Sequence, residues 1–317
     1  GDMIFENCYS LEYSHIPTSV KTIGDMAFGY CHNLTSMTIP KSVTSIGDYA
    51  FFGCNALSGI WGESGSSYYS NDSYGCLFNK NKTTFITAPG KLSGSYTVPS
   101  SVTDISPYAF AQRNGLTSVT IGKNVTSIGK HAFLACNDLK SITVNSSNTK
   151  YSSDSYGCLF NKNKTSLIRI PAQLSGSYVI PTSVTTIEEE AASFCEKLTA
   201  VTISDKVTQI GKYALSYNLK LNKIYFTGNA PAFGEACFAD VTATAYYPTG
   251  NSSWTSAVRQ NYGGTITWVS DLTGISVYTK PSQTTYYIGD SLNTSGLVIK
   301  LSMADGSTKN VSSGFTT

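Results

Sequence analysis

The sequence is poor in charge and has no marked excess of either sign. Only 13% of its 317 residues are charged, with 22 lysines and arginines against 20 aspartates and glutamates. No local cluster of basic residues offsets this balance, so the chain has no positive field that would attract a polyanion. We therefore expect no nucleic-acid partner.

Long hydrophobic runs are also absent. The longest apolar runs are far shorter than the about 20 residues of a membrane-spanning helix, so we expect no such segment in this chain. Residues 1–20 lack the basic and then apolar layout of a secretory signal. A signal, if the natural protein has one, is expected to have been removed.

Patterns for catalysis or metal binding are scarce. The three histidines, His15, His32 and His131, have no cysteine or carboxylate at the spacing of a zinc site or a catalytic triad. The acidic run at 188–190 is expected to be the exposed start of a helical turn, where acidic side chains favour the dipole, and not a cation site. We therefore expect no enzyme activity, no metal and no cofactor.

What the sequence does contain is an internal repeat. The motif Ile-Gly-x-x-Ala-Phe, or a variant of it, recurs with its isoleucine at steps of 23, 59, 23, 59 and 23 residues. These residues are Ile23, Ile46, Ile105, Ile128, Ile187 and Ile210. A short coil alternates with a long one, and the pair repeats every 82 residues, a period typical of a solenoid. One coil alone cannot offset an ordering cost of about 1.5 kcal/mol per residue, so the coils must stack.

Each short coil predicts a strand, a turn, a second short strand and a helical turn. Leu34, Met37 and Ile39 are apolar, and Ser36 and Thr38 would point the other way, which indicates a strand with one buried face. A second extended stretch is expected at 43–46. Gly47 and Asp48 then predict a turn and a helix cap, and the apolar side chains of 50–54 would share one face of a single helical turn.

The long coils carry an insertion that is nearly duplicated. Residues 72–83 and 154–165 both read DSYGCLFNKNKT. The Leu-Phe pair, the Asn-Lys-Asn-Lys segment and the apolar residues that follow predict a hairpin attached to the solenoid. Asp72 and Asp154 are expected to close a turn on their own backbone, and calcium binding is the alternative.

The cysteines also follow the repeat. Of the eight, Cys8, Cys31, Cys54, Cys136 and Cys195 share one repeat position, and Cys76 and Cys158 share another. Equivalent atoms in neighbouring coils lie about 4.8 Å apart with parallel Cβ vectors, whereas a disulfide needs about 3.8 Å between Cβ atoms. We predict a ladder of reduced, buried thiols, with a disulfide framework as the alternative. Because residues 4–8 match a coil already in progress, we expect the natural protein to extend upstream.

The repeat decays towards the C-terminal part of the chain. Residues 252–258 predict a capped amphipathic helix and 265–269 a last strand, so residues 227–270 predict a terminal cap. From about Leu272 the pattern changes to alternating strands.

These strands are expected at 275–278, 286–288 and 297–301, before a turn at 305–306. They predict a separate all-β module over 271–317 that is too short for a complete sandwich.

The repeat pattern resembles a known family. Ile-Pro-x-Ser-Val-Thr-x-Ile-Gly-x-x-Ala-Phe-x-x-Cys-x-x-Leu-x-x-Val, over residues 1–226, is similar to the BspA-like (Treponema-type) leucine-rich repeats of bacterial surface proteins. The tail, through Tyr-Ile-Gly-Asp-Ser-Leu at 287–292 and Asp-Gly-Ser at 305–307, is similar to part of a bacterial immunoglobulin-like domain. The expected fold is mainly β with short helical turns: a leucine-rich-repeat solenoid over 1–270, then a partial immunoglobulin-like module.

The resemblance implies a secreted or surface-anchored protein of a host-associated bacterium. Strand parity predicts a sheet face of hydroxyl side chains with occasional aromatic rings, and the ligand could be an extracellular protein or a glycan. The candidate contacts are Tyr13, His15, Trp61, Tyr68, Tyr69 and Tyr225. An exposed indole is a common interface anchor, although Trp61 could instead pack under the insertion, and the hydroxyls could serve only solubility.

Three functions follow from these expectations. A non-enzymatic binding protein, such as an adhesin, is the favoured interpretation. A structural spacer that self-associates through its tyrosine-rich insertions is the alternative. A hydrolase is the third, and no nucleophile or metal motif favours it.

Overall fold

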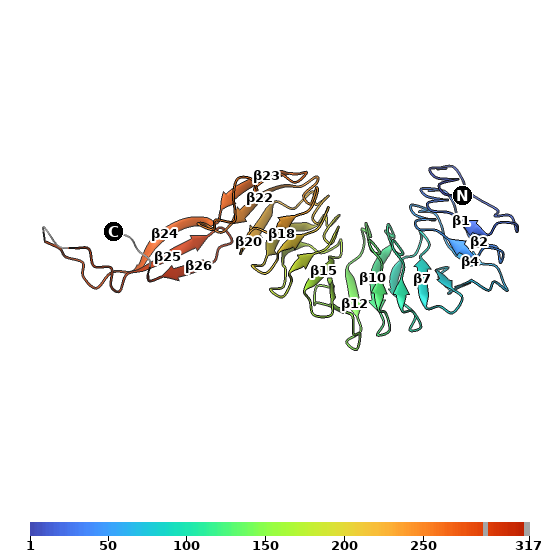
Figure 1. Cartoon of the computed structure of the whole chain (residues 1–317), viewed down its shortest axis with the longest axis horizontal. Helices are drawn as coiled ribbons and strands as arrows, with labels where there is room; N and C mark the ends of the chain where they lie inside the picture. Colours follow the sequence, from blue (N-terminus) through green and yellow to red (C-terminus); the bar gives the residue numbers. More distant parts are fainter. Residues whose placement is uncertain (288–290, 314–317) are drawn as a thin grey trace.

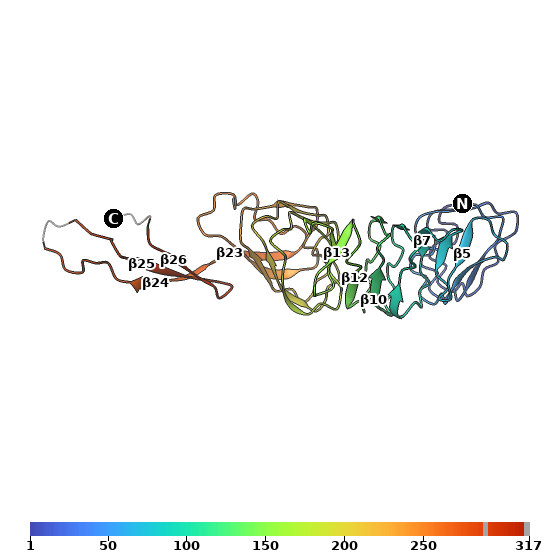
Figure 2. The ribbon, with the colours of Figure 1, turned by 90° about the horizontal axis from the view of Figure 1, so that it is seen from below.

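The computed structural model describes residues 1–287 and 291–313. Coils stack along the long axis of the molecule, and a small antiparallel sheet extends beyond one end of the stack (Figures 1 and 2). Every regular element among the described residues is a strand.

Most coils contribute one strand to a first row, in which neighbouring strands pair in parallel. It is divided into three sheets: β2 (Met37–Ile39) with β4 (Ile60–Gly62); β8 (Gly94–Thr97), β10 (Leu116–Ile121) and β12 (Ser141–Val144); and β16 (Gly176–Val179), β18 (Leu198–Ile203), β20 (Lys223–Phe226), β22 (Thr242–Tyr247) and β23 (Thr265–Ser270). Val119 pairs with Ile142 and Val201 with Ile224, so equivalent core positions lie in line.

The second row contains the repeat isoleucines. Its sheets are β1 (Thr22–Ile23) with β3 (Ser45–Ile46); β5 (Tyr69–Asn71), β6 (Leu77–Asn79), β7 (Thr84–Thr87), β9 (Asp104–Ile105) and β11 (Ser127–Ile128); and β13 (Tyr151–Ser153), β14 (Leu159–Asn161), β15 (Ser166–Arg169), β17 (Thr186–Ile187), β19 (Gln209–Ile210) and β21 (Ala232–Phe233). Ile23 pairs with Ile46 and Ile105 with Ile128. The predicted solenoid is confirmed.

The insertions form the hairpins that the sequence predicts. β6 and β7 are antiparallel, and so are β14 and β15. β5 and β13 each add a third strand that the sequence analysis did not identify. The hairpins therefore widen the second row of strands within each long coil.

The predicted helical turns are wrong. Residues 47–54 form successive tight turns, and Tyr49 at the third position after the isoleucine is left-handed, with φ 58°. The main chain pairs with the next coil: Met26 N donates to Asp48 O at 3.0 Å, and Phe28 N to Ala50 O at 2.9 Å. These bonds between coils replace the bonds within a helix, and two consecutive turns bury the same apolar positions that one helical turn would.

The amphipathic helix predicted at 252–258 is also wrong. This segment forms turns around Trp254, whose side chain is buried and whose Nε1 donates to Gly228 O at 2.9 Å. The last strand predicted at 265–269 is confirmed as β23. β21 pairs with β19 in the regular register, so the stack continues into the segment predicted as a cap. The boundary of the solenoid domain stays a prediction.

The cysteine ladder is confirmed. All eight cysteines are free thiols, and all except the half-buried Cys8 are buried. Sγ of Cys54 lies 3.0 Å from Phe28 O, and Sγ of Cys136 lies 2.9 Å from Phe110 O. These two thiols therefore donate to a main-chain carbonyl of the preceding coil, as a small buried side chain with one weak donor can.

The sheet beyond the solenoid comprises β24 (Leu272–Thr279), β25 (Val298–Met303) and β26 (Thr308–Val311), all antiparallel. The strands predicted at 275–278 and 297–301 fall largely in β24 and β25, and the turn at 305–306 is confirmed. Residues 286–287 are not in a strand, and positions 288–290 of the quoted motif lie outside the described residues. The immunoglobulin-like assignment stays a prediction.

Candidate binding surface

The outward side chains of the first row of strands form what we call the outer sheet face. All of them are exposed or half-buried, and hydroxyl groups dominate. They include Thr38, Trp61, Ser95, Thr97, Ser118, Thr120, Ser141, Thr143, Ser177, Val179, Thr202, Lys223, Tyr225, Thr244, Tyr246, Thr267 and Val269. The predicted strand parity therefore holds along most of the stack, with Ala200 as a buried exception.

Trp61 combines exposure with packing. Its side chain is 40% exposed, and one face of the indole covers Gly59 and Gly75. A Cβ at Gly59 would lie 2.5 Å from the indole Nε1, and one at Gly75 would lie 2.5 Å from the Gly59 Cα. The absence of side chains at these two glycines therefore leaves room for the indole ring, which stays partly exposed.

The other candidates are spread along the chain. Tyr13 is 72% exposed, His15 is exposed, and Tyr68 is 47% exposed. The prediction of Tyr69 as a surface contact is wrong, because this residue is only 8% exposed. Tyr68 immediately precedes β5 and points outward, whereas Tyr69, the first residue of β5, points inward. Burial raises the pKa of Tyr69 to about 12.

Tyr225 belongs to an aromatic pair that the sequence analysis missed. Its ring stacks on that of Tyr246, with centroids 5.0 Å apart and planes 13° apart. The two residues are register partners in β20 and β22. Tyr246 lies in the segment taken for a cap, and the signal that could have found it is its place one coil after Tyr225.

A cavity opens beside this pair. It measures about 420 Å³ and lies between the end of the solenoid and the β24–β26 sheet. Besides the two tyrosines, its lining includes Asp271, Asp305 and Lys309. Flat aromatic faces next to a few charged groups are typical of ligand sites.

The two insertion aspartates close turns, as predicted. Asp72 Oδ1 accepts from Tyr74 N at 2.9 Å and from Cys76 N at 3.0 Å, and Oδ2 accepts from the Tyr96 hydroxyl at 2.6 Å. Asp154 repeats this arrangement, with the Tyr178 hydroxyl at 2.7 Å. Both oxygens of each carboxylate are therefore occupied by protein donors.

The acidic run at 188–190 is only partly exposed, so the prediction for it is partly wrong. Glu188 is exposed, but Glu190 is half-buried, and its Oε2 lies 3.1 Å from Nδ1 of His131. The turn that carries Glu190 faces an earlier coil across a gap, which the sequence did not reveal. In the part of the chain that the structure describes, no three His, Cys, Asp or Glu residues are grouped as metal ligands.

Among residues 1–287 and 291–313, the structure contains no helix long and apolar enough to cross a membrane.

Comparisons with known proteins agree with the repeat. A family model described as the BspA type leucine rich repeat region matches residues 1–93, 92–176 and 172–247, with six copies. No curated protein matches the sequence.

Several solved structures are similar. A leucine-rich repeat protein from Eubacterium ventriosum is 22% identical, with a TM-score of 0.52 over 80% of this chain and 71% of that one. A leucine rich cell surface protein from Faecalibacterium prausnitzii is 24% identical, with a TM-score of 0.45 over 78% and 83%. The pneumococcal vaccine antigen PcpA is 21% identical, with a TM-score of 0.45 over 79% and 60%. The first of these likenesses supports the solenoid fold.

Proposed function

Because the chain belongs to the BspA-type leucine-rich repeat family, we propose that it is a non-enzymatic binding protein, secreted or held at a bacterial cell surface. Its partner would be an extracellular protein or a glycan. The partner would contact the outer sheet face. A stacked solenoid supports this role because it presents a long, rigid flank of equivalent positions.

The observation that carries the proposal is the Tyr225–Tyr246 pair. Two nearly parallel rings 5.0 Å apart make a flat apolar platform that lines the cavity of about 420 Å³. Asp305 and Lys309 line the same cavity and could fix the orientation of a bound group. Rigid aromatic anchors beside a few polar groups supply much of the energy in many interfaces.

The test is a binding screen of the full chain against matrix proteins and glycans. For any ligand found, Tyr225→Ala should weaken binding about tenfold or more, and Trp61→Ala should do so for a ligand that covers the N-terminal end of the face. Tyr217→Ala is the matched control, because this ring is 38% exposed and stacks on Phe194 at 4.6 Å outside the outer sheet face. An interaction that neither Trp61→Ala nor Tyr225→Ala weakens would contradict the assigned face.

Self-association is the second candidate function. Tyr74 and Tyr156 occupy equivalent positions in the two insertions, and they are 54% and 55% exposed. Each makes an edge contact with a buried tyrosine behind it, so each ring is held in a fixed pose. Two identical rings one period apart could contact a second copy. Light scattering should then show a mass that rises with concentration and falls for Tyr74→Ala/Tyr156→Ala, and a constant monomer mass would exclude the idea.

A further inference from the structure

The turns that follow the repeat isoleucines are held together by main-chain bonds, except at two gaps. Between regular coils, Tyr108 N donates to Lys130 O at 3.1 Å and Phe110 N to Ala132 O at 2.8 Å. Within the described residues, no such bond joins turn 47–53 to turn 106–112, or turn 129–135 to turn 188–194. We call these the upstream gap and the downstream gap, and each occurs where an insertion separates two short coils.

The type of residue that follows the repeat isoleucine differs between regular coils and the coils at the gaps. Where one coil directly precedes another, this residue is glycine: a Cβ at Gly129 would lie 2.3 Å from Pro107 N, and one at Gly47 would lie 2.6 Å from Asp25 N. At the first coil after each insertion it is Ser106 or Glu188. A side chain fits there because the segment behind it is a hairpin strand, β7 or β15, and not the equivalent turn of another short coil.

The upstream gap is filled by the protein itself. The rings of Tyr49 and Tyr108 lie 4.1 Å apart across it, and Phe52 makes an edge contact with Tyr108 at 5.8 Å. Arg113 is fully buried below, and each of its three guanidinium nitrogens has an acceptor, with Nε on Ala88 O at 3.0 Å. The cavity left over is about 120 Å³.

The downstream gap has smaller and more polar side chains at the same positions. His131, Leu134 and Glu190 stand 82 residues after Tyr49, Phe52 and Tyr108. The cavity there is about 280 Å³. The same backbone frame therefore leaves a small cavity in one copy and a larger one in the other.

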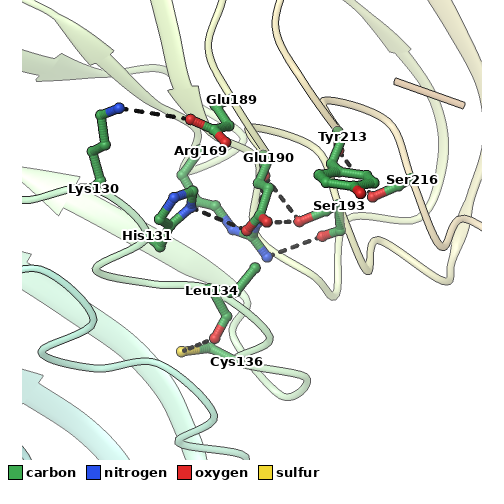
Figure 3. Close-up of polar contacts among 10 residues, drawn as sticks. All are labelled: Lys130, His131, Leu134, Cys136, Arg169, Glu189, Glu190, Ser193, Tyr213 and Ser216. Atoms are coloured by element: carbon green, nitrogen blue, oxygen red, sulfur yellow. Dashed lines mark hydrogen bonds and ion pairs between the residues drawn. The ribbon is translucent and has the colours of Figure 1, made fainter. Parts of the chain in front are cut away.

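Counting only the part of the chain that the structure describes, three buried polar atoms at the downstream gap have no hydrogen-bond partner. They are Nδ1 of His131, Oε2 of Glu190 and Nε of Arg169. The first two lie 3.1 Å apart, which is the distance of an ion pair if His131 is protonated, but they do not have hydrogen-bond geometry. Arg169 is only 4% exposed, and Figure 3 shows its guanidinium beside Glu190 and Ser193, where its other nitrogens donate to Glu190 O at 2.8 Å and Ser193 O at 3.0 Å.

Main-chain N–H groups at the downstream gap also lack hydrogen-bond acceptors within the described residues. The N–H groups of His131, Phe133 and Ala135 have no acceptor among the described residues. Their counterparts in the preceding coil bond to the following coil, so these three point across the gap. Buried or partly buried donors without acceptors are rare in folded proteins, and a bound group could satisfy them.

The charges of the gap favour a neutral ligand. Arg169 and Glu190 line it with opposite charges, and Lys130 pairs with Glu189 at 3.7 Å on the rim. An anion would be repelled by Glu190, and a cation by Arg169, without gaining an unopposed partner. A ligand with several groups that each donate and accept would satisfy both the Arg169 Nε and the Glu190 Oε2.

The shape of the gap favours a compact group over an extended peptide. His131 and Glu190 approach to 3.1 Å across it, so a main chain has no free path from one end to the other. The walls include Ile128, Tyr151 and Ile168, which offer apolar contact to a ring with C–H faces. We propose that the downstream gap binds one neutral sugar unit of a glycan, through its hydroxyl groups and its C–H faces.

The site contains no residue of the outer sheet face, so it goes beyond the proposed function and can fail separately from it. The probes are neutral hexoses and N-acetylhexosamines, added to the full chain and followed by saturation-transfer NMR and calorimetry. Acidic sugars and neutral tripeptides form the other arms. We expect a neutral sugar to bind, and His131→Tyr/Glu190→Tyr, which copies the upstream gap, to weaken it at least tenfold.

A more conservative substitution tests the proposal even if the double variant fails to fold. Glu190→Gln keeps the shape but removes the charged acceptor, so it should weaken binding about tenfold. Glu235→Gln makes the same chemical change in the exposed pair with Lys212, and it should have no effect. Trp61→Ala and Tyr225→Ala should also leave this binding unchanged. The proposal is overturned if no neutral sugar binds at about 10 mM, if the tripeptides bind instead, or if a bound sugar is insensitive to Glu190→Gln.

Discussion

Arg113 and Arg169 bring their guanidinium groups to the same place in the repeat from two different backbone positions. Arg113 Nη1 donates to Ala111 O at 2.7 Å, and Arg169 Nη2 donates to Ser193 O at 3.0 Å. Ala111 and Ser193 are equivalent residues, 82 positions apart. In a regular coil this carbonyl accepts from the main chain of the coil before it, so each arginine replaces a missing main-chain donor at a gap.

This relationship predicts that the two positions can be exchanged. Thr87 and Arg113 stand where the next copy has Arg169 and Cys195. Arg113→Cys should lower the free energy of unfolding by about 3 kcal/mol, because it leaves a cavity and an unpaired carbonyl. Thr87→Arg/Arg113→Cys should recover at least half of this loss. Urea unfolding followed by circular dichroism measures both, and a double variant no more stable than Arg113→Cys would refute the equivalence.

A second prediction concerns the tyrosines behind the insertion turns. Tyr178→Phe should destabilise the protein by about 2 kcal/mol, because it removes a hydroxyl that donates to the Asp154 carboxylate at 2.7 Å from a buried position. Tyr156→Phe, at a ring that is 55% exposed, should change the stability by less than about 0.5 kcal/mol. Thermal unfolding of the two variants side by side is the measurement, and equal melting temperatures would show that the buried bond contributes nothing.

A third prediction uses the glycine that follows the repeat isoleucine. Gly129→Ala should cost about 3 kcal/mol, because its Cβ would lie 2.3 Å from Pro107 N. Ser106→Ala is the matched control at the equivalent position after an insertion, and it should stay within about 0.5 kcal/mol of the parent. Chemical unfolding compares the two. Similar losses in both would mean that close stacking of coils is not the reason for glycine here.

The thiol ladder predicts a loss of stability at high pH. Burial raises the pKa of Cys54 to about 12, of Cys237 to about 12 and of Cys195 to about 11. In the unfolded chain a thiol titrates near 8.5, so above this pH the unfolded state binds fewer protons than the folded state. Each buried thiol should then lower the free energy of unfolding by about 1.4 kcal/mol per pH unit, until the folded pKa is reached.

Melting temperatures between pH 8 and pH 10.5 check this, with Cys54→Ala as the comparison. The fall with pH should be shallower in the variant. A parallel fall in both proteins would assign the effect to other groups.

Much of the architecture could be predicted because stacking leaves a periodic imprint. Equivalent side chains such as Ile23 and Ile46 meet the same environment in every coil, so their spacing in the sequence reports the stack. The thiol ladder was predicted for the same reason, because its cysteines follow the repeat. The hairpins and the turn closed by Asp72 were predicted because they depend on short local patterns.

The errors occur where contacts between coils decide the conformation. Residues around Tyr49 have the apolar spacing of a helical turn, but main-chain bonds to adjacent coils select tight turns with a left-handed residue. Tyr69 is on the inner side of β5, a strand that was not predicted. Glu190 faces His131 of an earlier coil, which hydrophobic patterning does not register. For the candidate surface, Tyr225 was identified from strand parity, whereas its stacking partner Tyr246 was not. The gaps were missed although the Gly-to-Ser and Gly-to-Glu changes at Ser106 and Glu188 signal them.

The placement of one gap in every 82-residue period has a consequence for how such a chain can evolve. In-frame duplication of a whole period lengthens the stack and creates one more gap with the same backbone donors. Mutations at the three positions occupied by His131, Leu134 and Glu190 can then alter the new gap while the surrounding coils keep their packing. Added length would in this way also add valency, and linked weak sites on one rigid scaffold bind a multivalent surface far more tightly than any single site.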